Sequence, residues 1–165
     1  MPKWPWSKPK ASSADAARAL RDQALSITAS DLGLAPTREL PNVFGILMET
    51  AYPEAVASLV AFAEGTTSLY FSSGGGIIGA GDHDTVRNAL PPFFEAAERH
   101  LTSFAKTTST PLPTVGRVRF YVRTHGGTLT AEAGEEELGE MRHELSPLFH
   151  AGHDVITAVR EASPG

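Results

Sequence analysis

The sequence predicts an α+β fold, in which a mainly antiparallel sheet of about five strands is flanked by three or four helices. Two observations lead to this prediction. Residues 58–71 and 117–133 each contain two strand-like segments joined by a tight turn, and short turns between consecutive strands imply antiparallel pairing. Segments with apolar residues at every third or fourth position lie before, between and after these hairpins, as is typical of helices packed on a sheet.

The chain of 165 residues is 41% hydrophobic and 20% charged, which is typical of a globular protein with one domain. We expect this domain to span residues 12–165, after an extended N-terminal arm at residues 1–11. Three prolines among the first nine residues prevent a helix in the arm. No apolar run approaches the roughly 20 residues of a membrane helix. Because the arm also lacks the apolar core of a signal peptide, we expect a cytoplasmic protein.

The arm contains both tryptophans of the chain, Trp4 and Trp6, beside three lysines. One hypothesis is contact with a membrane, with Trp at the headgroups and Lys on anionic lipid. The alternative is a tail that is free or packs on the domain or on a partner subunit. We favour the alternative and expect no stable membrane association, since stable anchoring takes more than a few residues.

Charge and cysteine content exclude several classes of function. Residues 1–40 carry a net charge of +2 and residues 41–165 carry one of −7. Such an acidic body argues against a nucleic-acid partner, because attraction to phosphates needs a basic surface. The absence of cysteine excludes disulfides, thiol catalysis and Cys-based metal sites. We expect no cofactor.

The first helix is predicted over residues 12–29, with Ser12 or Ser13 as its N-cap. Its apolar stripe consists of Ala16, Leu20, Ala24 and Ile27. Residues 31–41 form a linker. Residues 42–52 predict a strand with both faces covered, because nearly every position is apolar.

Residues 55–64 can be interpreted in two ways. Apolar residues at helical spacing favour a helix that ends at Gly65. The same residues also fit the first strand of a hairpin that turns at Gly65 and returns through β-branched and aromatic residues. We favour the hairpin.

The second half of the chain predicts two longer helices around one hairpin. Asp82 or Asp84 is expected to cap the first helix, and Pro91-Pro92 to interrupt it, because proline cannot donate a helical hydrogen bond. The hairpin pairs residues 117–123 with residues 128–133. Ser146-Pro147 predicts the N-cap and first residue of the last helix.

The elements thus run in the order helix, about three strands, helix, hairpin and helix. This order resembles that of small sensor and scaffold domains of the profilin, longin and roadblock families. The resemblance covers element order alone, because no sequence motif accompanies it. It implies an interaction module, often dimeric, rather than an enzyme.

Five glycines fall within eight residues: Gly74, Gly75, Gly76, Gly79 and Gly81. They include a G-x-G-x-x-G pattern between a predicted strand and a predicted helix, where backbone N–H groups can bind phosphate. The surrounding meander is not a βαβ unit, and acidic residues at positions 82 and 84 stand where a phosphate would lie. The alternative is a turn, or a glycine-rich strand that allows close backbone packing.

Two further groups of residues are candidate sites. Arg117, Arg119, Tyr121 and Arg123 share one face of a strand, where they could bind an acidic partner or simply pair with a neighbouring strand, as Arg119 would with Glu132. Zinc binding would use histidine and carboxylate side chains of the last helix. This candidate metal site consists of His150, His153 and Asp154. His143 would be a further ligand only if the helix continued through Pro147. For both groups we favour the structural explanation.

No constellation of catalytic residues emerges from the sequence. A nucleophile elbow at Ser72 fails, because the glycine required two positions earlier is replaced by Tyr70. We therefore expect a non-enzymatic protein-interaction or regulatory module. It would associate with itself, as a homodimer, or with another protein. The alternative is a small-ligand or nucleotide-binding protein that uses the glycine-rich loop at residues 74–81.

Overall fold

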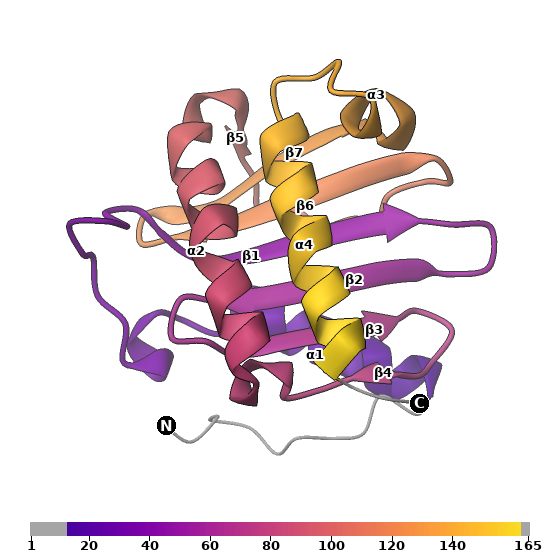
Figure 1. Ribbon diagram of the computed structural model, residues 1–165, viewed down its shortest axis with the longest axis horizontal. Helices are drawn as coiled ribbons and strands as arrows, with labels where there is room; N and C mark the ends of the chain where they lie inside the picture. The colour runs from indigo at the N-terminus through magenta and orange to yellow at the C-terminus, as the bar shows by residue number, and fades with distance from the viewer. Residues whose placement is uncertain (1–12, 163–165) are drawn as a thin grey trace.

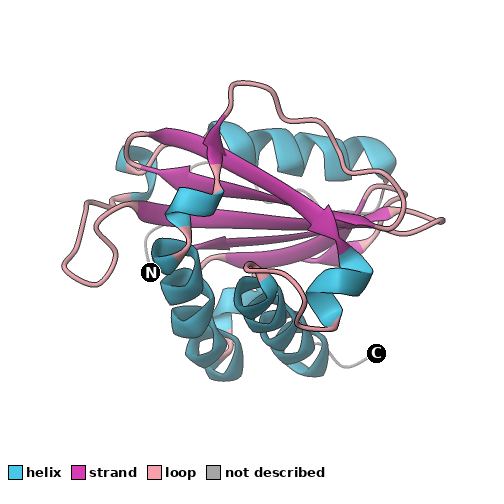
Figure 2. Cartoon of the chain, turned by 90° about the horizontal axis from the view of Figure 1, so that it is seen from above, coloured by secondary structure: helices cyan, strands magenta, loops and turns pink. Residues whose placement is uncertain are grey.

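The computed structural model describes residues 13–162, which form one antiparallel sheet with helices on both of its faces (Figures 1 and 2). The strands follow the spatial order β4-β3-β2-β1-β6-β7-β5. They are β1 (Val43–Ala51), β2 (Val56–Phe62), β3 (Thr67–Phe71), β4 (Gly76–Ile77), β5 (Ala105–Lys106), β6 (Arg117–Thr124) and β7 (Gly127–Gly134). The helices are α1 (Ala14–Ser26), α2 (Asp84–Arg99), α3 (Glu135–Gly139) and α4 (Ser146–Ala162). The predicted N-terminal arm, with Trp4 and Trp6, lies outside the described residues.

The predicted α+β class and antiparallel sheet are confirmed, but the described sheet has seven strands rather than about five. The two extra strands, β4 and β5, contain two residues each and lie at the two edges of the sheet. Strands this short have no alternation that a sequence pattern could reveal.

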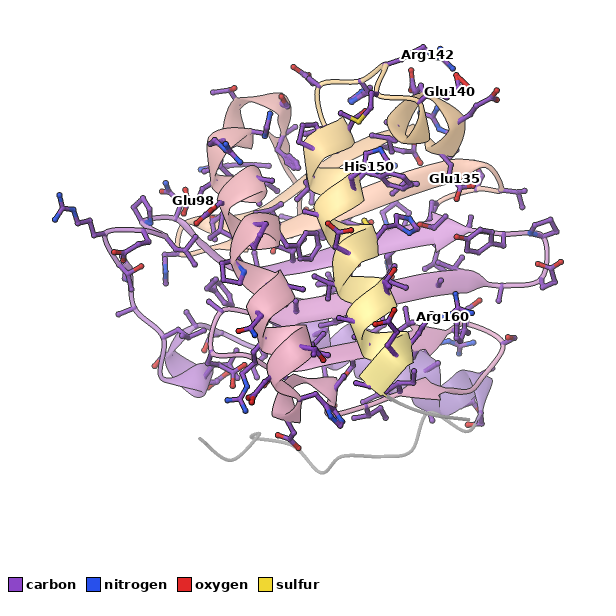
Figure 3. All side chains as sticks on the ribbon, in the orientation of Figure 1. Glu98, Glu135, Glu140, Arg142, His150 and Arg160 are labelled. Carbon is purple, nitrogen blue, oxygen red and sulfur yellow. The ribbon has the colours of Figure 1, made fainter. Side chains whose placement is uncertain are left out.

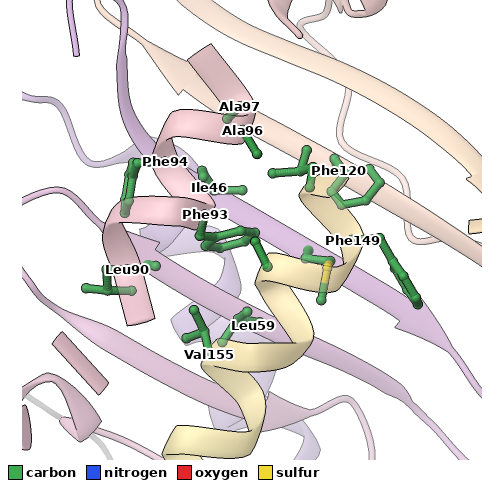
Figure 4. Close-up of a cluster of buried hydrophobic side chains, with 14 of the residues drawn as sticks. Ile46, Leu59, Leu90, Phe93, Phe94, Ala96, Ala97, Phe120, Phe149 and Val155 are labelled. Atoms are coloured by element: carbon green, nitrogen blue, oxygen red, sulfur yellow. The ribbon is translucent and has the colours of Figure 1, made fainter. Parts of the chain in front are cut away.

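The sheet separates two hydrophobic cores. On the front face, α2 and α4 pack over β1, β2 and β6, and Figure 4 shows Phe93 and Phe149 in this core. On the back face, α1 packs over the opposite side chains of β1 and β2. All nine residues of β1 are buried, which confirms a strand covered on both faces.

The hairpin interpretation of residues 55–64 is confirmed. β2 and β3 pair antiparallel around a turn at Gly65, whose φ of 112° lies in the left-handed region that favours glycine. The helical alternative is wrong, because β2 is buried over its whole length and no exposed helical face exists there.

Two predictions about α2 are wrong. The helix runs unbroken through Pro91 and Pro92. These prolines remove the N–H groups that would bond the carbonyls of Arg87 and Asn88, but all four residues are exposed, so water can reach the freed carbonyls. The N-cap is His83, which makes no side-chain capping bond, rather than either neighbouring aspartate.

The start of α1 is as expected, because the Ser13 hydroxyl oxygen accepts a hydrogen bond from the backbone N–H of Ala16 at 3.1 Å. Its buried stripe contains Ala17 in place of the expected Ala16. α4 begins at Ser146, where a helix start was predicted. Within the described residues, no helix combines the length and hydrophobicity of a bilayer-spanning segment.

Candidate functional site

Polar side chains cross the back face of the sheet in one line, and we call this line the polar row. Register places Tyr70 of β3 opposite Ser58 of β2, and Ser58 opposite Glu49 of β1. Glu49 in turn lies opposite Arg119 of β6, which lies opposite Glu132 of β7. Directly opposed residues on one face of a sheet are close enough to interact, so the pairing itself brings these groups together.

Glu49 is the centre of the polar row and is 0% exposed. Its Oε2 accepts hydrogen bonds from Arg21 Nε and from the Ser58 hydroxyl, both at 2.7 Å. Its Oε1 accepts a second hydrogen bond from Arg21, at 2.9 Å from Nη2. This two-pronged pairing is the strong geometry for a guanidinium and a carboxylate, and it satisfies both oxygens.

Arg21 also ties α1 to the sheet and to the loop before β6. Its Nη2 donates to the carbonyl oxygen of Thr110 at 2.8 Å. Burial alone would lower the pKa of Arg21, but the hydrogen bond and the negative charge of Glu49 outweigh burial and raise it. The guanidinium therefore stays charged, and α1 is held by a buried ion pair.

Tyr70 ends the polar row with a hydroxyl group that has no hydrogen-bond partner within residues 13–162. The residue is 3% exposed, and both burial and the negative charge of Glu49 raise the pKa of its phenol. The phenol therefore stays protonated at neutral pH and has a proton to donate. Since an unpaired buried hydroxyl costs free energy, this group marks a place where a partner is missing.

A cavity of about 270 Å³ lies between α1 and the back face of the sheet, and Tyr70 is one of the residues that line it. We call it the α1 cavity. Its lining comes from α1, from β2 and β3 with the residue that follows, and from the loop before β6. The lining residues are Ala14, Ala17, Arg18, Arg21, Asp22, Ser58, Tyr70, Ser72 and Leu112.

Two serines of the α1 cavity differ in the hydrogen bonds left to them. Ser58 donates its proton to Glu49. Ser72 accepts a hydrogen bond from the backbone N–H of Val56 at 2.8 Å, and its own proton has no acceptor among the described residues. Ser72 is therefore a hydroxyl donor at this cavity, whereas the hydroxyl of Tyr70 is buried.

The glycines predicted to bind a ligand each have a packing or conformational reason to be glycine. Gly76 is part of β4, and a side chain there would clash with the backbone of Tyr70. Gly81 lies against the carbonyl oxygen of Gly65, where a Cβ atom would have no room. Gly74, Gly75 and Gly79 have positive φ, which glycine adopts without strain. The segment is thus partly strand and partly turn, and the α1 cavity is lined by other residues.

The arginine face of β6 is largely covered. Arg117 and Arg119 each lie 3.5 Å from Glu132, and the latter contact was the expected cross-strand pair. Tyr121 is 0% exposed, and its hydroxyl donates to the carbonyl of Pro111. The fourth member, Arg123, is 8% exposed and donates to the carbonyls of residues 24 and 27 at the end of α1. Only Arg117 and Arg119 of this set keep substantial contact with solvent.

Within residues 13–162, the histidines of α4 do not gather with other potential ligands into a group that could hold a metal. His150 and His153 both pack against the ring of Phe149, with centroids 5.5 and 4.4 Å away (Figure 3 labels His150). Asp154 is exposed, and His143 uses its Nδ1 to accept the backbone N–H of Leu145. No group of three potential ligands that could hold a metal exists within residues 13–162.

The residues of the polar row were mostly missed from the sequence, apart from the Arg119–Glu132 pair. One signal was available, because Glu49 is an acidic residue inside a strand with both faces covered, where it needs a buried partner. Nothing in the spacing identifies that partner as Arg21, which lies 28 positions earlier. No family model, curated protein or solved structure matches this chain.

Proposed function

We propose that this protein is a non-enzymatic binding module that takes a small molecule in the α1 cavity. One observation carries the proposal: Tyr70 lines that cavity, and its buried hydroxyl has no hydrogen-bond partner within residues 13–162. Ligand pockets typically combine apolar walls with a few converging polar groups. Here the alanines of α1, Leu112 and the ring of Tyr70 supply the apolar wall. Ser72, Arg18 and Asp22 supply polar groups.

The charged groups near the cavity favour binding over catalysis. Both oxygens of Glu49 are engaged by Arg21 and Ser58, so the carboxylate has no free geometry for a general base. Ser72 lacks a histidine partner among its hydrogen bonds. The ligand would therefore bind in the α1 cavity, rather than at the glycine-rich loop that the sequence had suggested for a small molecule.

A fragment screen by NMR tests this function on the full chain. Fragments that bind should shift the amide signals of α1 and β3. The variant Tyr70→Phe should lower the affinity of these fragments and leave the fold intact, since it removes one oxygen atom and keeps the ring. Tyr52→Phe is the matched control, because Tyr52 is exposed and lies outside the cavity. Fragments that shift only signals elsewhere would refute the proposal.

Self-association is a second candidate, as a regulatory module that pairs with another copy. Its support is that Val115, in the loop before β6, and Met141, just after α3, are 64% and 62% exposed. The backbone N–H of Glu135, the first residue of α3, bonds to the carbonyl of Gly116, which joins α3 to the loop that contains Val115. Light scattering across protein concentration tests it, with Met141→Lys as the variant, and a constant monomer mass would exclude it.

A further inference from the structure

We propose that the N-terminal arm of one copy of this protein docks in an acidic groove on a second copy. The groove lies on the front face, between α2, the turn that joins β2 to β3, and the loop before β1, and its volume is about 310 Å³. Parts of residues 39–40, 63–65 and 87–95 line it, and we call it the α2 groove. It is separate from the α1 cavity, so this inference goes beyond ligand binding there.

The α2 groove has an apolar floor that an occupant can reach. Leu90 and Phe94 of α2 form its buried part, where they join the front core (Figure 4). Leu40 and Ala63 also line the groove and are half-buried, while Pro91 is exposed. These last three residues keep contact with water, so an apolar side chain laid on them would gain by burial.

The charged groups of the α2 groove are mainly acidic. Three carboxylates, those of Glu39, Glu64 and Glu95, line it together with one cation, Arg87. The guanidinium of Arg87 lies 3.7 Å from the carboxylate of Asp84, which offsets part of its charge. Glu39 and Glu95 have no hydrogen-bond or ion-pair partner among the described residues. The groove therefore attracts positive charge.

Pro91 adds a further hydrogen-bond acceptor. Proline has no backbone N–H, so the carbonyl oxygen of Arg87, one turn earlier in α2, lacks the donor that a regular helix would supply. Both residues line the groove. Carboxylates and a freed carbonyl together favour an occupant that brings hydrogen-bond donors.

The N-terminal arm has the matching chemistry. Residues 1–11 contain Lys3, Lys8 and Lys10 and no acidic residue, so the remainder of the chain has a net charge of −8 within a total of −5. The arm also contains Trp4 and Trp6. Lysine side chains and the indole N–H donate hydrogen bonds without accepting them, which suits the acceptors of the groove. The indole ring suits its apolar floor.

A second copy can supply this arm more readily than the same chain can. Ser13 begins α1 on the back face, beside the α1 cavity, whereas the α2 groove lies on the front face and at the other end of β3. Trp6 precedes Ser13 by seven residues, so it lies at most about 25 Å away in a fully extended chain. The straight path passes through the sheet, and an arm that entered its own groove would have to go round the edge.

Two exchanged arms bury enough surface for a reversible dimer. A tryptophan side chain buries about 150–250 Å², so the four of a symmetric dimer bury roughly 600–1,000 Å² before the surface of the grooves is counted. Weak and transient complexes bury less than about 1,200 Å². We therefore expect a dimer that dissociates on dilution and at high salt concentration.

Tryptophan fluorescence tests the inference on the full chain, because Trp4 and Trp6 are its only tryptophans and report on the arm alone. As the chain concentration rises from micromolar to millimolar, light scattering should show the mass doubling. Over the same range the emission should move to shorter wavelength, and quenching by acrylamide should fall several-fold. Glu39→Lys/Glu95→Lys reverses two exposed charges of the groove and should raise the dissociation constant of the dimer about tenfold or more.

The matched control is Glu54→Lys/Glu136→Lys, which makes the same change in net charge at two exposed positions outside the groove. This control should not raise the dissociation constant. A dimer weakened equally by both double variants would mean that net charge, and not the α2 groove, controls association.

Three other results would overturn the inference. Emission and quenching equal to those of a synthetic peptide of residues 1–11 at every concentration would show that the arm does not dock. Shielded tryptophans with a constant monomer mass would place the arm on its own chain. A dimer that Glu39→Lys/Glu95→Lys leaves intact, or that Met141→Lys dissociates, would use another surface. Fragment binding in the α1 cavity is measured independently of all these results, so the two proposals fail separately.

Discussion

The buried ion pair between Arg21 and Glu49 gives the sharpest test of the structure through the variant Arg21→Met. Methionine keeps an unbranched side chain of similar length, so α1 can still pack on the sheet. The change leaves Glu49, which is 0% exposed, with the Ser58 hydroxyl as its remaining partner among the described residues. Breaking a buried pair in this way typically costs about 3–5 kcal/mol.

For a chain of this length, each kcal/mol corresponds to roughly 2–4 °C in the melting temperature. We therefore expect Arg21→Met to melt about 6–20 °C lower than the original chain, and urea denaturation to show a matching loss of unfolding free energy. Arg18→Met is the control on the same helix, because its pair with Asp15 is exposed and should contribute almost nothing. A loss below about 1 kcal/mol for Arg21→Met would refute the buried pair as an anchor of α1.

The double variant Arg21→Met/Glu49→Leu separates the ion pair from its desolvation. When both charges are replaced by apolar groups of similar volume, the cost is often abolished or reversed. We expect the double variant to recover most of the stability lost by Arg21→Met. A double variant as unstable as the single one would mean that Arg21 stabilises the fold through its bond to Thr110 rather than through Glu49.

Three further predictions follow from backbone geometry and burial. Gly81→Ala should destabilise the fold by several kcal/mol in urea denaturation, because its Cβ would clash with the carbonyl of Gly65, and a near-neutral result would contradict this packing. Pro92→Ala should raise the unfolding free energy by up to about 3 kcal/mol, since it restores a helical hydrogen bond to Asn88, and lower stability would contradict it. Burial lowers the pKa of His153, although the nearby Glu135 opposes this. Its contribution to stability should therefore be complete above about pH 6.5 and fall as the pH drops toward the folded pKa, because the unfolded chain then binds more protons. His153→Gln should flatten the stability profile below about pH 6.5, and an unchanged slope there would argue against a neutral buried imidazole.

Local patterns in the sequence predicted the long elements and failed where tertiary contacts decide. The alternation of apolar and polar residues was enough to predict β6, because Val118, Phe120 and Val122 all face the front core. Pro91-Pro92 misled the prediction because the sequence does not reveal that this side of α2 faces solvent, where freed carbonyls are tolerated. The two edge strands could not be predicted, since two residues carry no periodic signal.

The candidate site was harder to predict than the fold, because its members come from separate parts of the chain. Glu49 could be identified as a buried acid in need of a partner, but Arg21, Tyr70 and Leu112 lie on three other segments. Each of these residues is ordinary in its own segment. Their chemistry arises from the register of the sheet and from the placement of α1, neither of which a spacing rule encodes.

Among the described residues, five side chains have a buried polar atom without a hydrogen-bond partner: Gln23, Tyr70, Arg119, His150 and His153. Two of them, Tyr70 and Arg119, belong to the polar row on the back face of the sheet. The two histidines belong to α4 on the front face, so the unsatisfied groups are not confined to the polar row. Buried ion pairs and unpaired polar groups stabilise a fold less than well-packed apolar residues do, so stability alone does not explain why Glu49 and Tyr70 stand at the centre and the end of the polar row.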